Sequence, residues 1–406
     1  MNDLSTCRIC VLDDDPFMLS LLTGLLTGLG ATAIETAASG LDVLDDIARG
    51  DAPELILADL NMPEMDGVEF VRKLAEYRYR GALIPVSGED QRLLRAMCIL
   101  IQAHHISVLG YLQKPVSRER LGDLLGHWAP GRDTRPETSR RSYSANRIMA
   151  AIRNGELVNH YQPKVELATG NVIGVETLVR WRHPQDGMVY PDQFIAVAEA
   201  SGVIERLTGW VLNEALAQSR RWSLAGIDLR MAVNVSMNNL ASISFTDFVT
   251  EEAQCACVPP ARLVLEVTES RLMRDPRAPL EILTRLRLKR FGLSIDDFGT
   301  GHSSLRQLCD IPFDELKIDK SFVHRAWEDE TSRAVVAVSQ GLARQLGMKV
   351  VGEGVEDRED WDFLRCAGCD HAQGYFIARP MPAEEFLAWL GEWRVRVPAL
   401  LAPSPS

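Results

Sequence analysis

Residues 263–268 read Leu-Val-Leu-Glu-Val-Thr, an apolar run that carries a single carboxylate. Because side chains alternate along a β-strand, the apolar residues of this run share one face and Glu266 points to the other. Residues 315–319, Glu-Leu-Lys-Ile-Asp, repeat the pattern around Lys317. Buried ionisable groups are disfavoured unless they share a partner. The pattern therefore predicts strands whose polar faces converge on one site.

Similar short runs alternate with helical segments over about 250 residues, the usual size of a (β/α)8 barrel. The predicted strands are 172–175, 230–235, 263–267, 293–297, 315–318, 349–351 and 375–377. In such a barrel the apolar face of each strand packs on the outer helices, and the opposite face points inward. We expect the following polar residues to gather at one mouth: Glu176, Asn234, Glu266, Asp296, Asp297, Lys317, Glu353 and Gln373.

The possible metal ligands in this set are five carboxylates and the amide of Asn234, and the set contains neither His nor Cys. Hard oxygen ligands of this kind suit Mg²⁺ or Mn²⁺ rather than zinc. Asp296 and Asp297 are adjacent and would normally face opposite sides of a strand, but the Gly-rich continuation gives the backbone freedom to turn. One carboxylate can then bridge two ions about 3.5–4 Å apart, the arrangement used in phosphodiester hydrolysis.

The first part of the chain alternates apolar runs, such as 7–12 and 55–58, with amphipathic stretches, such as 16–29 and 67–77. Short strands separated by helices indicate a parallel sheet covered on both faces. A polar segment with two prolines follows and is typical of a linker. We expect an α/β chain with a doubly wound (βα)5 domain over 1–128, a linker over 129–145, a (β/α)8 TIM-like domain over 146–395 and a disordered tail over 396–406.

Polar residues also follow the strands of the first domain. Asp13 and Asp14 come after its first strand and Asp59 after its third, which places them at the carboxyl edge of a parallel sheet. Three convergent carboxylates repel one another unless a hard cation such as Mg²⁺ lies between them. Ser87 ends a later strand and Lys114 follows another, so that a hydroxyl and an ammonium group are placed to hold the oxygens of a phosphoryl group.

Four motifs support this interpretation: Val-Leu-Asp-Asp-Asp-Pro (11–16), Ala-Asp-Leu-Asn-Met-Pro-Glu-Met-Asp-Gly (58–67), Val-Ser-Gly-Glu (86–89) and Tyr-Leu-Gln-Lys-Pro (111–115). With them, residues 5–127 resemble the response-regulator receiver family. The resemblance implies a sensor histidine kinase or phosphotransfer protein as partner. It also implies a role for each residue: Asp59 as phosphoacceptor, Asp13 and Asp14 for one Mg²⁺, Ser87 and Lys114 for the phosphoryl group, and Tyr111 as the aromatic switch.

The second domain carries Tyr-Gln-Pro-Lys-Val (161–165), Gly-Val-Glu-Thr-Leu-Val-Arg-Trp (174–181), Leu-Glu-Val-Thr-Glu-Ser (265–270), Asp-Asp-Phe-Gly-Thr-Gly (296–301), Leu-Lys-Ile-Asp (316–319), Gly-Glu-Gly-Val-Glu (352–356) and Gln-Gly-Tyr (373–375). It resembles the EAL-type cyclic di-GMP phosphodiesterases. Two positions depart from that family. Thr177 replaces the Ala of the signature triplet, a change that activity should tolerate because the metal-binding Glu176 is kept. His302 stands where a Tyr is usual in the loop after Asp297, and this change is expected to alter turnover or regulation.

The resemblance implies hydrolysis of cyclic di-GMP to linear 5′-pGpG by two Mg²⁺ or Mn²⁺ ions. It assigns Glu176, Asn234, Glu266 and Asp296 to the first metal, Asp296, Asp297 and Glu353 to the second, and Gln162 and Arg180 to the substrate. Lys317 would orient the attacking water, Glu353 is the position proposed as general base, Gln373 would lie beside the water, and Glu269 would anchor the loop after Asp297. A homodimer or tetramer is expected on the same ground.

Composition narrows the function further. The formal net charge of −12, without a Lys/Arg-dense stripe, disfavours DNA binding. The sequence has neither an apolar stretch of roughly 18–20 residues nor an N-terminal leader pattern, and its eight cysteines are scattered. We therefore expect a cytoplasmic protein that does not enter a membrane.

Two other functions are compatible with the same motifs. The barrel could be a catalytically weak cyclic di-GMP-binding effector that signals through protein partners. It could also be a scaffold that only dimerises, in which case it would not bind the nucleotide. Because every metal-ligand position and Lys317 are present, the sequence favours the hydrolase.

Overall fold

The computed structural model describes residues 4–5, 7–126, 128, 143–268, 277–300 and 310–402. The chain forms two compact units, residues 1–140 and 141–406. Within the described residues, no helix is both long enough and apolar enough to cross a membrane.

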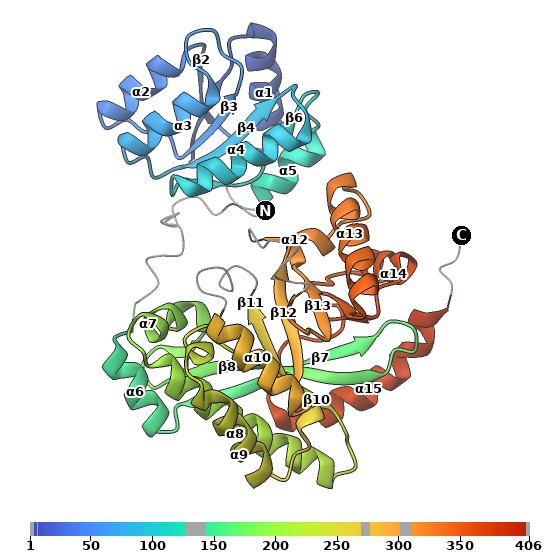
Figure 1. Ribbon diagram of the computed structural model, residues 1–406. Coiled ribbons are helices and arrows are strands. Elements are labelled where there is room, and N and C mark those ends of the chain that lie inside the picture. The colour runs from blue at the N-terminus through green and yellow to red at the C-terminus, as the bar shows by residue number, and fades with distance from the viewer. Residues whose placement is uncertain are drawn as a thin grey trace. The chain divides into compact units, whose positions relative to one another are not determined.

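The first unit is a parallel sheet with helices on both faces (Figure 1). Its strands lie in the order β2-β1-β3-β4-β5, and β6 pairs with the far end of β4. The strands are β1 Arg8–Leu12, β2 Ala33–Ala37, β3 Leu55–Asp59, β4 Ala82–Ser87, β5 Ser107–Val108 and β6 Leu112–Gln113. The helices are α1 Pro16–Gly28, α2 Gly40–Ala48, α3 Gly67–Glu76, α4 Gln91–Ala103 and α5 Arg118–Gly126.

Two separate apolar cores confirm the doubly wound prediction. Along β1, Cys10 and Leu12 pack into the core formed with α2, α3 and α4, whereas Ile9 and Val11 pack into the core formed with α1 and α5. The alternation arises because successive side chains of a strand point to opposite faces. All strands run in the same direction, so that their carboxyl ends meet at one edge.

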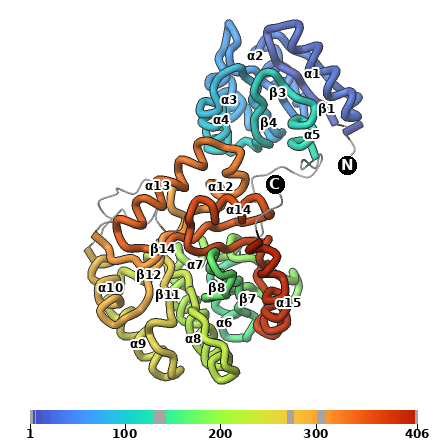
Figure 2. The backbone as a smooth tube through the Cα atoms, turned by 90° about the vertical axis from the view of Figure 1, so that its right-hand side faces the viewer, coloured from blue at the N-terminus to red at the C-terminus, as the bar shows by residue number. Residues whose placement is uncertain are grey.

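The second unit is a closed barrel surrounded by helices (Figures 1 and 2). Its strands pair in the order β10-β11-β12-β13-β14-β15-β7-β8, and β8 pairs with β10 to close the ring. The strands are β7 Leu157–Glu166, β8 Val172–His183, β10 Arg230–Asn234, β11 Leu263–Thr268, β12 Gly292–Phe298, β13 Glu315–Ile318, β14 Lys349–Gly352 and β15 His371–Ala372, while β9 Gly187–Val189 pairs only with β8.

The barrel is not uniformly parallel, because β7 runs antiparallel to both neighbours. A short turn through Gly170, whose φ is 69°, joins β7 to β8 as a hairpin. Parallel neighbours would instead need a long crossover connection. The predicted barrel is thus confirmed, with a first strand that the sequence analysis did not include.

The predicted strand at 375–377 is wrong. The strand lies earlier, at His371–Ala372, and the chain then turns. The backbone of Gly374 passes so close to Val355 that a Cβ at this position would lie 2.2 Å from the Val355 nitrogen. This approach, and the hydrogen bond from the Ile377 nitrogen to the Gly374 oxygen (3.1 Å), fold the segment into a turn instead of an extended strand.

The helices of the second unit cover the outer, apolar faces of the strands. Leu263, Leu265 and Val267 of β11 are at most 1% exposed and belong to the same core as the buried face of α10. The helices are α6 Ala145–Arg153, α7 Ile195–Ala200, α8 Ile204–Leu224, α9 Ser244–Cys255, α10 Arg277–Leu288, α12 Lys320–Val323, α13 Glu330–Leu346, α14 Arg358–Ala367 and α15 Ala383–Leu401. The polar residues between these apolar positions are therefore directed into the barrel.

Candidate active site

Polar side chains from nearly every barrel strand meet at the carboxyl ends of the parallel strands. Glu176 comes from β8, Asn234 from the end of β10, Glu266 from β11, Asp296 and Asp297 from β12, Lys317 from β13, Glu353 from directly after β14, and Gln373 from directly after β15. Gln162 joins them from β7, since it lies opposite Glu176 in the β7–β8 register. The structure thus brings the predicted set together.

The ammonium group of Lys317 lies at the centre of the carboxylates. Its Nζ atom is 2.7 Å from Glu353 Oε1, 2.9 Å from Asp296 Oδ1, 3.1 Å from Glu266 Oε2 and 3.5 Å from Glu176 Oε2. Lys317 is 1% exposed, and burial lowers the pKa of an ammonium group, but the four surrounding carboxylates outweigh burial and raise it well above its usual value. Lys317 therefore stays protonated and acts as a counter-ion to the whole cluster.

Amide side chains hold Glu176 from two sides. Asn234 Nδ2 donates to Glu176 Oε1 (2.8 Å), and Gln373 Nε2 donates to Glu176 Oε2 (2.6 Å). Gln373 Nε2 also donates to Gln162 Oε1 (3.1 Å), and Gln162 Nε2 donates to the backbone oxygen of Ala378 (3.1 Å). The chain of donors fixes the orientation of the carboxylate.

Asp296 and Asp297 both reach the site because β12 is irregular where they lie. The register with β13 shifts between Ile295 and Phe298, and Asp297 has a left-handed backbone with φ of 56°. Asp tolerates this conformation better than most residues. The turn thus begins at Asp297 itself, two residues before Gly299, the first of the glycines expected to provide it. Oxygens of Asp296, Asp297 and Glu353 lie within 4.8 Å of one another.

The electrostatic balance of the site favours a divalent cation. Four carboxylates surround the ammonium group of Lys317, and Asp297 adds a fifth carboxylate beside Asp296 and Glu353. Burial raises the pKa of Glu266 to about 8 and that of Glu353 well above its usual range, and burial together with Asp296 raises the pKa of Asp297 to about 6. Within the described residues, Glu266 Oε1 is a buried oxygen without a hydrogen bond. An excess of buried oxygen ligands over positive charge fits Mg²⁺ or Mn²⁺.

The first unit has a second carboxylate site at the carboxyl edge of its sheet. Oxygens of Asp13, Asp14 and Asp59 lie within 4.8 Å of one another. Lys114 Nζ lies 2.8 Å from Asp13 Oδ2 and 3.1 Å from Asp59 Oδ1. Ser87 is fully buried at the end of β4, and its backbone oxygen accepts a hydrogen bond from the Lys114 nitrogen (2.8 Å). The site gathers all five predicted residues.

Burial raises the pKa of Asp59 above its usual value, although Lys114 opposes that shift. Burial lowers the pKa of the Lys114 ammonium group, but its hydrogen bonds with Asp13 and Asp59 outweigh burial, so that its pKa is raised. A buried Asp beside one ammonium group and two further carboxylates combines a nucleophilic oxygen with ligands for a hard cation. Tyr111 lies between β5 and β6, half-buried against the core that contains α4.

Comparisons with known proteins identify the families of both domains. The family model of the EAL domain matches residues 145–380, and that of the response regulator receiver domain matches residues 9–125. This chain is a response regulator of the EAL family. Cyclic di-GMP phosphodiesterase RocR of Pseudomonas aeruginosa is 34% identical over 389 residues, which cover 95% of this chain and 98% of RocR.

Two further matches concern the EAL domain alone. The bifunctional diguanylate cyclase/cyclic di-GMP phosphodiesterase MucR of Pseudomonas aeruginosa is 45% identical over 242 residues, which cover 59% of this chain and 35% of MucR. A solved structure of the PaMucR phosphodiesterase in its c-di-GMP complex is 44% identical, has a TM-score of 0.57, and matches 59% of this chain and 97% of that chain.

A cavity of about 320 Å³ opens above the EAL carboxylates, at the lower end of the roughly 300–1,000 Å³ typical of ligand pockets. Asp319, Glu356 and Tyr375 also line the cavity. All three belong to the sequence motifs of the domain, but no role was predicted for them. Tyr375 is 53% exposed, with the Arg379 guanidinium 4.2 Å from its ring centre. The sequence signal that could have identified them is their position two or three residues after Lys317, Glu353 and Gln373.

One predicted residue, Arg180, lies apart from this cluster. Arg180 is buried, with its guanidinium 5.2 Å from the ring centre of Tyr190, and does not line the cavity. Glu269 and His302 lie outside the described residues.

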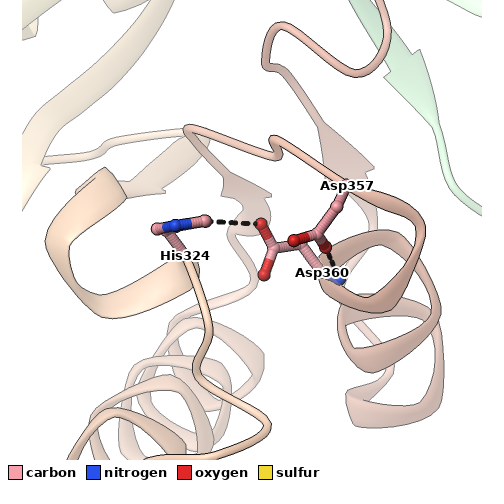
Figure 3. A group of neighbouring side chains, drawn as sticks. All are labelled: His324, Asp357 and Asp360. Carbon is pink, nitrogen blue, oxygen red and sulfur yellow. Dashed lines mark hydrogen bonds and ion pairs between the residues drawn. The ribbon is translucent and has the colours of Figure 1, made fainter. Parts of the chain in front are cut away.

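A group formed by His324, Asp357 and Asp360 also has the composition of a metal site (Figure 3). Asp360 is fully buried, but Arg325 and Glu356 donate their backbone nitrogens to its two oxygens (2.8 and 3.1 Å), and His324 Nδ1 lies 3.0 Å from it. Asp357 caps α14 by accepting from the Asp360 nitrogen (2.8 Å). The carboxylates are already engaged, so the group serves to join the start of α14 to the segment after α12.

Proposed function

We propose that the EAL domain hydrolyses cyclic di-GMP to linear 5′-pGpG with two divalent cations, Mg²⁺ or Mn²⁺, under the control of phosphorylation at Asp59. The gathering of five carboxylates below an open cavity, four of them around Lys317, carries this proposal. The similarity to RocR over the whole chain and to the c-di-GMP complex of PaMucR supports the choice of substrate.

The site residues would have different roles in hydrolysis. Glu176, Asn234, Glu266 and Asp296 would hold the first cation, and Asp296, Asp297 and Glu353 the second. Bound cations of this kind polarise a phosphate oxygen and lower the pKa of water. Glu353 is the residue that would take the proton of the attacking water, and Lys317, whose Nζ atom lies 2.7 Å from Glu353, would orient that water.

Amide and guanidinium groups would position the substrate. Gln373 Oε1 is buried and, within the described residues, has no hydrogen-bond partner, so it is available to accept from the water or the substrate. Arg180 can hold a phosphate through two parallel hydrogen bonds if it moves from the ring of Tyr190. Gln162 supports Gln373 through the hydrogen bond between their side chains.

Phosphorylation of Asp59 by a sensor histidine kinase or phosphotransfer protein would regulate the output. Asp13 and Asp14 would hold one Mg²⁺, and Lys114 already contacts Asp59 at 3.1 Å. A phosphoryl group adds negative charge and acceptor oxygens, which would engage Lys114 and the hydroxyl of Ser87. Movement of Ser87 would be transmitted to Tyr111, the neighbour of β6, because β6 pairs with the end of β4.

The test is to incubate purified protein with cyclic di-GMP and Mg²⁺ or Mn²⁺ and to separate the products by chromatography. We expect linear 5′-pGpG from the unmodified chain and from Glu281→Gln, a control at an exposed carboxylate of α10. Glu176→Gln and Lys317→Met should each lose most turnover. Turnover that survives in Glu176→Gln would refute the metal assignment, whereas tight nucleotide binding without product would show a binding effector instead of an enzyme.

Regulation requires a separate experiment with acetyl phosphate as phosphodonor. Turnover by the unmodified chain should change after phosphorylation, and turnover by Asp59→Asn should not. An equal response in both proteins would refute control through Asp59. The homodimer or tetramer expected from the resemblance is measured in the same preparations by light scattering.

A further inference from the structure

A second layer of buried polar residues lies directly beneath the carboxylate site. It consists of Lys164 in β7, Ser294 in β12, Glu315 in β13 and His371 in β15, all less than 9% exposed. Each stands two residues from a site residue: Lys164, Ser294 and Glu315 from Gln162, Asp296 and Lys317 on the same strand, and His371 from Gln373, which directly follows β15. A spacing of two keeps a side chain on the same face of a strand. These residues therefore point into the barrel, one layer below the active site.

Glu315 is the centre of this layer. Its Oε1 atom forms an ion pair with Lys164 Nζ and accepts a hydrogen bond from the hydroxyl of Ser294 (3.1 Å). His371 Nδ1 lies 3.5 Å from the other oxygen, Oε2. The nearby Lys164 ammonium lowers the pKa of Glu315 in spite of full burial, so that the carboxylate is ionised. Glu315 thus fixes the position of the Lys164 ammonium group from below.

Lys164 joins the two layers. Its Nζ atom lies 3.5 Å from Oε1 of Glu266, while Lys317 Nζ lies 3.1 Å from Oε2 of the same carboxylate. Glu266, which is only 1% exposed, thus lies between two ammonium groups, one from each layer. Within the described residues, Oε1 has no hydrogen bond of its own. The Lys164 charge is thus a principal restraint on the orientation of that oxygen.

The alternative is that Lys164 and Glu315 form an ion pair that only fills the barrel. A buried ion pair contributes little to stability compared with apolar residues of the same volume. An apolar layer would therefore serve that purpose equally well. The position of the ammonium group between Glu315 and Glu266 has a different consequence, since residues that orient metal ligands from the second layer control metal affinity.

We propose that Lys164, held by Glu315, is a positioning residue that orients Glu266 for binding of the divalent cation. The inference rests on the proposed function, because Glu266 is there assigned to the first metal. Lys164 does not touch the cavity, and its effect on the reaction passes entirely through Glu266.

The experiment measures Mn²⁺ affinity by electron paramagnetic resonance, and Tm in EDTA, for the full chain and its variants. Lys164→Met should bind Mn²⁺ about 10- to 100-fold more weakly than the unmodified chain, the range measured for residues that orient metal ligands. It should also require correspondingly more Mn²⁺ for half-maximal turnover, and turnover should recover at saturating Mn²⁺. Lys349→Met is the matched control, since Lys349 is also on a barrel strand but is exposed and paired with Asp370.

A second variant separates positioning from stability. Lys164→Met leaves Glu315 as a buried, unpaired charge and lowers Tm; adding Glu315→Gln removes that charge and keeps an acceptor for Ser294. The double variant should recover most of the lost Tm but remain 10- to 100-fold weaker in Mn²⁺ affinity. If it bound Mn²⁺ as tightly as the unmodified chain, Lys164 would be structural and the inference overturned.

Failure of the proposed function and failure of the role of Lys164 would give different results. If the unmodified chain neither bound Mn²⁺ nor hydrolysed cyclic di-GMP, the proposed function itself would be wrong. If the unmodified chain did both and either Lys164 variant matched its Mn²⁺ affinity, only the role of Lys164 would be refuted.

Discussion

Protons and divalent cations should compete for the EAL carboxylates. Burial raises the pKa of Glu266 to about 8, so that in the metal-free protein this carboxyl group is about 90% protonated at pH 7. A cation that binds to Glu266 must displace that proton. Metal affinity should therefore rise with pH across this range, whereas an ordinary surface carboxylate is ionised throughout it and makes metal affinity independent of pH.

The size of the pH effect on Mg²⁺ affinity follows from the pKa of Glu266. With a pKa of about 8, the ionised fraction of Glu266 rises from about 1% at pH 6 to about 9% at pH 7 and about 50% at pH 8. The apparent affinity for Mg²⁺ should thus rise about tenfold from pH 6 to pH 7, by about 1.4 kcal/mol, then about fivefold to pH 8, and level off above that. The raised pKa of Glu353 acts in the same direction.

Isothermal titration calorimetry tests this directly. Titration of Mg²⁺ at pH 7 in two buffers with different ionisation enthalpies should show release of about 0.9 proton from Glu266, in addition to any from Glu353. Glu266→Gln should release about one proton fewer, whereas Glu281→Gln, at an exposed position, should behave as the unmodified chain. Affinity that is constant from pH 6 to pH 8, with no proton release, would refute the reasoning.

Three further predictions concern single side chains. Gly374→Ala should lower the free energy of unfolding by about 1–3 kcal/mol and Tm by roughly 2–12 °C in a thermal melt, because its Cβ would lie 2.2 Å from the Val355 backbone. Gly391→Ala is the control, since a Cβ at this helical position would have no atom within 4 Å, and it should leave Tm unchanged or higher. Asp360→Ala should cost about 1–3 kcal/mol for each backbone amide that loses its acceptor, visible as a lower midpoint in urea, and an unchanged midpoint would contradict the assigned joining role. Asp59→Asn should show no phosphate-dependent mobility shift on Phos-tag gels after treatment with acetyl phosphate, and a persistent shift would place the phosphoacceptor elsewhere.

The amino-acid sequence by itself determined which face of each strand is polar. Alternation along a strand is a local property, so Glu266 and Lys317 could be placed opposite their apolar neighbours without knowledge of any partner strand. In the receiver domain, the structure shows the same alternation, since Cys10 and Leu12 of β1 enter one apolar core and Ile9 and Val11 enter the other. Motif spacing then placed the carboxylates at strand ends, where parallel neighbours bring them together.

Only the tertiary structure decided how the strands and their polar groups pair. The antiparallel course of β7, which puts Gln162 opposite Glu176, depends on a hairpin whose register is set by long-range pairing. The bulge that turns Asp297 toward the site, and the turn that replaces the predicted strand at 375–377, likewise arise from contacts with β13 and with Val355.

The ion pairs of Lys317 and Lys164 also depend on both the sequence and the tertiary structure. The positions of Lys317 and Lys164 on their strands follow from the sequence, but their contacts with Glu266 join residues 51 and 102 positions away along the chain. Electrostatic energy depends on distance and burial, which alternation alone does not specify. The closed barrel fixes both quantities, and for that reason the ammonium groups on either side of Glu266 became visible only in the folded chain.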